Sequence, residues 1–107
     1  MDIRQYDIVL VNLDPTKGSE IKKTRPCLVI SPNEMNRYLR TLIVAPITSS
    51  GKAYPTRVKT QHNKKMGWAV IDQIRTIDKS RVLKVLGTIS QKEIESCKRV
   101  LKETFVD

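Results

Sequence analysis

Three short, unbroken apolar runs constrain the fold of this chain more than any other feature of its sequence. They are Ile8–Val11, Cys27–Ile30 and Leu42–Ala45. Apolar runs of this length, bounded by turn residues, are typical of buried strands, and no long helical pattern separates them. We therefore expect a compact barrel or a curled sheet rather than strands alternating with helices.

The same runs bear on the oligomeric state. A small antiparallel sheet normally leaves one face wet, so its strands alternate between apolar and polar residues. Continuous runs indicate that both faces are covered, and a single helix can cover only part of that surface. We expect a second copy of the chain to cover the remainder, which predicts a homodimer. The alternative is that some of these apolar side chains are simply exposed.

The remaining elements are further short strands and one long final helix. Strands are expected over residues 8–13, 27–30, 41–48, 56–60, 68–71, 73–77 and 82–89, with a short helical turn at 33–38 and turns at 49–52 and 62–65. Pro46 lies inside the third strand and suggests an edge or a bulge, because proline cannot donate to a ladder.

The final helix has the clearest start signal in the chain. Ser90 and Glu93 have the spacing of a capping box, in which each side chain bonds the backbone amide of the other residue. Apolar positions then follow at helical spacing on one face, at Ile94, Cys97, Val100, Leu101 and Thr104.

Length and layout place bounds on the protein class. The 107 residues fit one domain, spanning 1–107. The N-terminus lacks the layout of a signal peptide and no apolar run approaches membrane-spanning length, so we expect a cytoplasmic protein. Cys27 and Cys97 lie in apolar patterns without metal-binding spacing, and free buried thiols are favoured over a disulfide.

The charge favours a polyanionic partner. Twenty Lys and Arg residues stand against eleven Asp and Glu residues, for a net charge of +9. Such an excess attracts nucleic acids or acidic protein segments, in a salt-dependent way. Charge alone does not choose among RNA, DNA, an acidic protein tail and a membrane surface, although no amphipathic anchor is present for a membrane.

Common catalytic motifs are missing from the sequence. The single histidine, His62, lies in a lysine-rich turn with no carboxylate or cysteine at ligand spacing, which argues for a solvated turn residue. No nucleophile elbow and no phosphate-cradling glycine loop occur. We therefore expect neither a metal nor a cofactor. What remains are polar residues near strand ends, which periodicity alone does not bring together.

Three motifs in order resemble one family. They are Asp14–Glu20 (DPTKGSE) followed by Arg25-Pro26, then Ala45–Ser49 (APITS), then Asp72–Lys79 (DQIRTIDK). Their order and spacing over nearly the whole chain are similar to those of the MazF/PemK/Kid toxins. The resemblance implies a mainly β, small SH3-like barrel of the MazF/PemK/CcdB type with a C-terminal helix, forming a homodimer.

The resemblance also implies an activity and partners. Such toxins belong to type II toxin–antitoxin pairs and mostly cut single-stranded RNA at short sequences without metal, and we expect mRNA as the target. The expected products carry a 2′,3′-cyclic phosphate and a 5′-hydroxyl, and the outcome is inhibited translation and growth. The expected protein partner is an antitoxin with an acidic C-terminal segment, and operator DNA is contacted only through that antitoxin.

Residue roles follow where the motifs match. Arg25 matches the family's catalytic arginine and suits a phosphate clamp, because a guanidinium can bond two phosphate oxygens. Thr48 matches the catalytic threonine. Glu20 matches the base of one branch and Asp72 that of another. In that second branch an arginine and a histidine also take part, and here Val70 and Ser19 stand in their places. This departure favours Arg25, Thr48 and Glu20 as the catalytic residues over a mechanism in which Asp72 is the base.

Other residues are assigned more loosely. Candidates for catalysis or RNA binding are Asp72, Gln73 and Ser49, and candidates for RNA binding are Lys17, Lys22, Lys23, Asn36 and Arg75. Trp68 could stack on a base, but as the only tryptophan in an apolar strand it is favoured as a core residue. Two rivals stay open: a toxin of the same fold that binds DNA gyrase, and a barrel that binds nucleic acid without cutting it.

Overall fold

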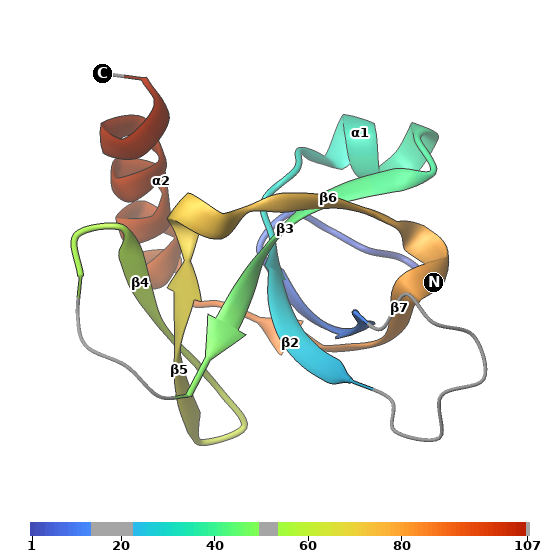
Figure 1. The fold of residues 1–107 in the computed structure, drawn as a ribbon, viewed down its shortest axis with the longest axis horizontal. Coiled ribbons are helices and arrows are strands. Elements are labelled where there is room, and N and C mark those ends of the chain that lie inside the picture. The colour runs from blue at the N-terminus through green and yellow to red at the C-terminus, as the bar shows by residue number, and fades with distance from the viewer. Residues whose placement is uncertain (14–22, 50–53, 107) are drawn as a thin grey trace.

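A computed structural model describes residues 1–13, 23–49 and 54–106, and over these residues the chain is mainly β (Figure 1). The strands are β1 (Asp7–Asn12), β2 (Thr24–Val29), β3 (Thr41–Thr48), β4 (Arg57–His62), β5 (Lys65–Val70), β6 (Arg75–Asp78) and β7 (Val82–Thr88). The helices are α1 (Asn33–Tyr38) and α2 (Gln91–Phe105), with short 3-10 helices η1 (Ile71–Gln73) and η2 (Lys79–Arg81).

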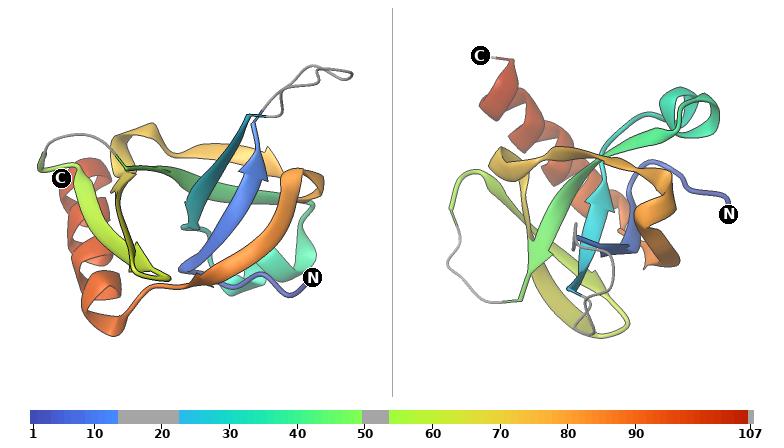
Figure 2. Two further views of the ribbon diagram at one scale, coloured as in Figure 1. Left: turned by 90° about the horizontal axis from the view of Figure 1, so that it is seen from below. Right: turned by 45° about the vertical axis from the view of Figure 1, so that its right-hand side comes forward.

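The strands form one antiparallel sheet that curls on itself. The order is β4-β5-β3-β2-β1-β7, and β6 pairs with β3 beside this path. Figure 2 shows the strands wrapping into a half-barrel, with α2 packed alongside the β4–β5 end. The predicted curled sheet with a C-terminal helix is confirmed.

Strand β3 is the junction of the sheet, because it changes partners along its length. Residues Thr41–Val44 pair with β6, whereas Ile47 and Thr48 pair with β5. Pro46 falls between these two partners while still pairing with Cys27 of β2. Of the two alternatives expected at Pro46, an edge or a bulge, the edge is wrong, because β3 is a central strand. The proline does mark an interruption of regular pairing, since it occupies the gap where the partner of β3 changes from β6 to β5.

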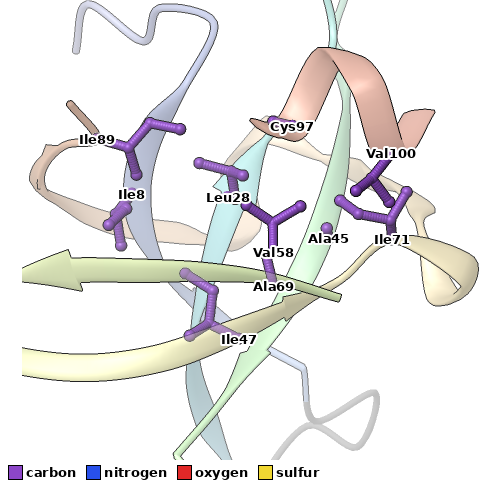
Figure 3. Packing of buried hydrophobic residues seen from close by; sticks show 10 residues of the cluster. All are labelled: Ile8, Leu28, Ala45, Ile47, Val58, Ala69, Ile71, Ile89, Cys97 and Val100. Carbon is purple, nitrogen blue, oxygen red and sulfur yellow. The ribbon is translucent and has the colours of Figure 1, made fainter. Parts of the chain in front are cut away.

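The three apolar runs are buried on both faces within one chain. Ile8 belongs to a first cluster and the next residue, Val9, to a second, because successive residues of a strand point to opposite faces. The first cluster lies between β1–β3 and the layer of β4, β5 and α2 (Figure 3). The second is the interior of the curl, closed by β6 and the start of β7. A second subunit is thus not needed to explain this burial.

The members of each cluster come from well-separated parts of the chain. The first cluster contains Ile8, Leu28, Ala45, Ile47, Val58, Ala69, Ile71, Ile89, Cys97 and Val100. The second contains Val9, Val11, Cys27, Val29, Leu42, Val44, Ile77 and Val82.

Helix α2 begins as the sequence predicts. The Ser90 amide donates to Glu93 Oε1 at 2.8 Å, and the Glu93 amide donates to Ser90 Oγ at 3.2 Å, which completes the capping box. Cys97 and Val100 are buried against the first cluster, and both cysteines of the chain are free and buried. No helix in the described ranges is long and apolar enough to span a membrane.

The β4–β5 hairpin is tighter than expected. Only Asn63 and Lys64 form its turn, both with positive φ (48° and 64°), while His62 pairs with Lys65 in the ladder. The predicted four-residue turn is therefore corrected to two residues. This places His62 at the end of a strand, on the same face as the buried side chains of Val58 and Thr60.

Candidate active site

Arg25 and Thr48 lie near each other just beyond the end of the β2–β3 ladder. The last register pairs are Leu28 with Ala45 and Cys27 with Pro46, and continuing this register by two residues sets Arg25 opposite Thr48. Both positions lie two residues from the Cys27–Pro46 pair, so their side chains share its face of the sheet. The exposed Arg25 and the half-buried Thr48 therefore form the polar continuation of the second cluster at the open end of the curl.

A second ladder brings Arg75 to the same face. Arg75 of β6 pairs with Val44 of β3, which belongs to the second cluster. Arg25 and Arg75 then line one hollow of about 580 Å³, which we call the arginine hollow. Its lining residues are Leu13, Lys23, Thr24, Arg25, Cys27, Pro46, Gln73 and Arg75.

Arg25 also borders a smaller hollow on the side of the β4–β5 hairpin. This hairpin hollow measures about 340 Å³ and includes Thr48 and Ser49 at the end of β3. Its lining residues are Thr24, Arg25, Pro26, Ile47, Thr48, Ser49, His62, Lys65, Met66 and Gly67. Arg25 and its neighbour Thr24 thus line both concave surfaces, and Arg25 has a suitable position for a cation that holds a phosphate between two nucleotides.

His62 and Lys65 were not expected at this place. The sequence places His62 in a solvated turn, whereas the structure has it half-buried in the hairpin hollow with Arg25 and Thr48. The alternation of Val58 and Thr60 along β4 carried a signal for this inward orientation. The signal was missed because the turn was assigned two residues too many.

Charge in both hollows has one sign over the described part of the chain. Lys23, Arg25 and Arg75 line one hollow, Lys65 lines the other, and no described carboxylate lines either. Such an arrangement favours the negative charge of a phosphodiester.

The one thiol in the arginine hollow is held in its neutral form. Burial raises the pKa of Cys27 from 9.0 to about 11, and the positive charges of Arg25 and Arg75 only partly oppose this. Because the thiolate is the nucleophilic form, Cys27 is a packing residue at neutral pH.

The remaining predicted residues divide into three groups. Ser49, Lys23, Gln73 and Arg75 line the hollows. Asp72 is exposed in η1 and lines neither of them. Glu20, Lys17 and Lys22 lie outside the described residues. Among the described residues, no group of three His, Cys, Asp or Glu side chains could hold a metal ion.

Asn36 takes an internal role instead of the predicted one. Its side chain is 4% exposed, its Nδ2 donates to the Ser31 carbonyl at 2.9 Å, and its Oδ1 accepts from Ser31 Oγ. The side chain that we assigned to RNA binding therefore fixes the start of α1. We remove Asn36 from the candidate surface, because burial leaves it no free polar group to offer a ligand.

Comparison with known proteins identifies the family of this chain. The sequence profile of the PemK-like, MazF-like toxins of type II toxin–antitoxin systems matches residues 4–105. The chain belongs to this toxin family. The toxin is 33% identical over 93 residues to the endoribonuclease toxin MazF of Escherichia coli K12, covering 86% of the chain and 84% of the relative. It is 37% identical over 98 residues to the endoribonuclease MazF of Staphylococcus epidermidis, covering 86% and 82%.

Solved structures share the fold of the toxin over almost its whole length. The MazE–MazF complex of Deinococcus radiodurans has a TM-score of 0.83 at 25% identity, covering 99% of the toxin and 97% of that chain. A mycobacterial endoribonuclease in complex with its cognate antitoxin also has a TM-score of 0.83, at 18% identity, covering 97% and 95%. The family and the fold inferred from the three motifs are confirmed.

Proposed function

We propose that the toxin is an endoribonuclease that cuts single-stranded RNA through attack of the ribose 2′-hydroxyl, without a metal ion. Its enzyme class follows from the family and from curated relatives named endoribonucleases. The observation that carries the chemistry is the placement of Arg25 opposite Thr48, at the border of two hollows without a described carboxylate. The products are a 2′,3′-cyclic phosphate and a 5′-hydroxyl.

Each step of this reaction has a candidate group. The 2′-hydroxyl loses its proton as its oxygen bonds to phosphorus, charge builds on the phosphoryl oxygens, and the 5′-oxygen leaves with a proton. Arg25 can bond two of the charged oxygens at once and keeps its charge at neutral pH. The Thr48 hydroxyl can donate to a phosphoryl oxygen from across the ladder. Metal ions are not required in this scheme, because the guanidinium supplies the positive charge.

Proton transfer has three candidate residues. Glu20 and Asp72 are the candidates that the sequence suggests, and the structure adds His62. Asp72 lines neither hollow, whereas His62 lines the hairpin hollow with Arg25 and Thr48. We therefore favour Glu20 over Asp72 for the transfer of protons to and from the ribose oxygens. His62 is the weaker addition, because strand alternation puts its side chain on the face of the first cluster, whereas Arg25 and Thr48 lie on the face of the second.

The partners follow from charge and family. Single-stranded RNA, chiefly mRNA in the cytoplasm, is the proposed substrate, and its cleavage would stop translation and growth. The proposed antitoxin covers the same hollows with an acidic C-terminal segment, which the net charge of +9 favours. Operator DNA would be contacted only through that antitoxin. We keep the homodimer as part of the proposal, and exposed apolar side chains on β7, at Leu83 and Val85, offer it a surface.

The test is a cleavage assay with two polymers of the same sequence. Purified toxin is incubated in EDTA with a long RNA and with the matching single-stranded DNA, and the cut ends are mapped. We expect cuts in RNA at a short recurring sequence, intact DNA, and loss of cutting in Arg25→Ala with its fold retained. RNA left intact by the toxin, or cut only after magnesium is added, would contradict the proposal and favour a binding-only barrel or a gyrase-binding toxin.

A further inference from the structure

Trp68 does not belong to either hydrophobic core. It lies on β5 between Gly67 and Ala69, and Ala69 points into the first cluster. Neither cluster of the described residues contains Trp68, and it is not among the partly buried side chains packed against them. The expectation that this tryptophan fills the core is therefore wrong. Strand alternation turns it away from the first cluster and leaves it half-buried.

The sheet places Trp68 next to the proposed catalytic threonine. Trp68 pairs with Thr48 in the β3–β5 ladder and with Lys59 in the β4–β5 ladder. Directly paired residues of antiparallel strands have their side chains on the same face, about 5 Å apart. The continued β2–β3 register adds Arg25 opposite Thr48, so four side chains from β2, β3, β5 and β4 form one row across the sheet, in the order Arg25, Thr48, Trp68, Lys59.

We propose that this cross-strand row is the path of the RNA beside the cut bond. Trp68 stacks on the base of a nucleotide adjacent to the phosphate held by Arg25 and Thr48, and Lys59 contacts the next phosphate. The proposal rests on the proposed function, since it takes Arg25 and Thr48 to hold the cut phosphate. A single strand has unstacked bases that an aromatic face can accept, whereas a duplex does not.

The chemistry of the row matches a single strand better than an acidic peptide. An indole offers a broad apolar face, and base stacking on such a face is tolerant of sequence. Lys59 is exposed at the far end of the row and is free to follow a flexible backbone. Along the row, the cation and the hydroxyl of Arg25 and Thr48 suit the cut phosphate, and the aromatic ring of Trp68 suits the adjacent base. The cation of Lys59 suits the next phosphate of the same RNA strand. Sequence selection would then come from other contacts, while Trp68 sets the affinity for any base.

The unique tryptophan makes this inference directly measurable. Because the chain has one Trp, its fluorescence reports Trp68 alone. The probe is a short oligodeoxythymidylate strand, which carries bases and phosphates but no 2′-hydroxyl to be cut. The matched control is an abasic strand with the same number of phosphates. We expect the thymidylate strand to quench the emission and the abasic strand to bind with little quenching. Equal quenching by both strands, or binding of the thymidylate strand without quenching, would overturn the inference.

Variants separate stacking from structure. Trp68→Leu removes the aromatic face and should weaken binding of the thymidylate strand by roughly tenfold, whereas Trp68→Phe should keep most of it. Phe105→Leu is the control, because Phe105 is 53% exposed at the far end of α2. Lys59→Ala should lower the salt dependence of binding by about one phosphate contact, and Lys102→Ala should leave it unchanged. If Trp68→Leu is unfolded by circular dichroism, the comparison of the two strands on the unmodified toxin decides.

The two proposals can fail separately. Base-dependent quenching without any RNA cleavage would remove the nuclease and keep the stacking site. RNA cleavage without base-dependent quenching, and equal activity of Trp68→Leu and Trp68→Phe, would remove the stacking site and keep the nuclease.

Discussion

Arg25 and Thr48 each lie two residues beyond the last β2–β3 pair, Cys27–Pro46, so the continued register sets them opposite each other, and both line the hairpin hollow. The backbone at both positions is anchored, because both strands continue into the second cluster, where their inward side chains are almost fully buried. A guanidinium and a hydroxyl on adjacent strands can approach the same phosphate without rearrangement of the fold. Preorganisation of this kind favours the transition state, because little reorganisation is needed at the moment of reaction.

The rate of RNA cleavage should depend on the hydroxyl of Thr48 rather than on the shape of its side chain. Thr48→Val keeps the volume and removes the donor, so we expect kcat to fall about a hundredfold or more with KM little changed. Thr48→Ser keeps the hydroxyl and should retain most of the activity. The measurement is single-turnover cleavage of one mapped RNA site. Equal rates for the Val and Ser variants would show that the hydroxyl takes no part.

His62 should not be the residue that moves protons, because its side chain shares the face of Val58 and Thr60, opposite to that of Arg25 and Thr48. We expect His62→Ala to cut a mapped RNA site at close to the normal rate, whereas loss of a general acid or base usually costs about a hundredfold or more. A hundredfold fall in kcat for His62→Ala, with part of the rate restored by added imidazole, would contradict this placement and assign the proton transfer to His62.

Gly67 should be irreplaceable because of its closeness to β3. An added Cβ would lie 2.6 Å from Ile47 Cγ2 and 3.3 Å from the Thr48 carbonyl oxygen. We expect Gly67→Ala to lower the free energy of unfolding by about 1–3 kcal/mol in urea, the usual cost of overpacking, and to reduce activity by displacing Thr48. Gly87→Ala is the control, because its Cβ would meet only His62 Cβ at 4.0 Å. Equal stability of the two variants would contradict this packing.

Stability should fall at alkaline pH through the two buried thiols. Burial raises the pKa of Cys27 and of Cys97 from 9.0 to about 11. Between these values the unfolded chain has lost the thiol protons and the folded chain still holds them, so rising pH favours unfolding. Replacement of both cysteines by alanine should make the decline above pH 9 shallower in urea titrations. An unchanged slope would show that the thiols titrate alike in both states.

The sequence indicated the elements of this fold more fully than the contacts between them. The capping box at Ser90 and Glu93 is local chemistry, so it could be read directly. The double burial of Ile8 and Val9 was also visible, but its cause was assigned to a second subunit. Only the curl of the sheet, a long-range property, showed that one chain supplies both clusters.

The same limit applied to the site. The motifs named Arg25 and Thr48, but only the ladder register placed them opposite each other and set Trp68 beside Thr48. Asn36 was misassigned because its burial depends on packing against Ser31, which no spacing reveals. His62 was passed over for the same reason, since its inward face depends on where the hairpin turns.

The most direct test of the central claim replaces one oxygen atom. Once a cut site is mapped, an RNA is made with a single 2′-deoxyribose on the 5′ side of that bond, and is incubated with the toxin in EDTA. We predict that this bond stays intact while other sites in the same RNA are cut normally, leaving 2′,3′-cyclic phosphate and 5′-hydroxyl ends. Cutting at the modified bond at the normal rate would contradict attack by the 2′-hydroxyl.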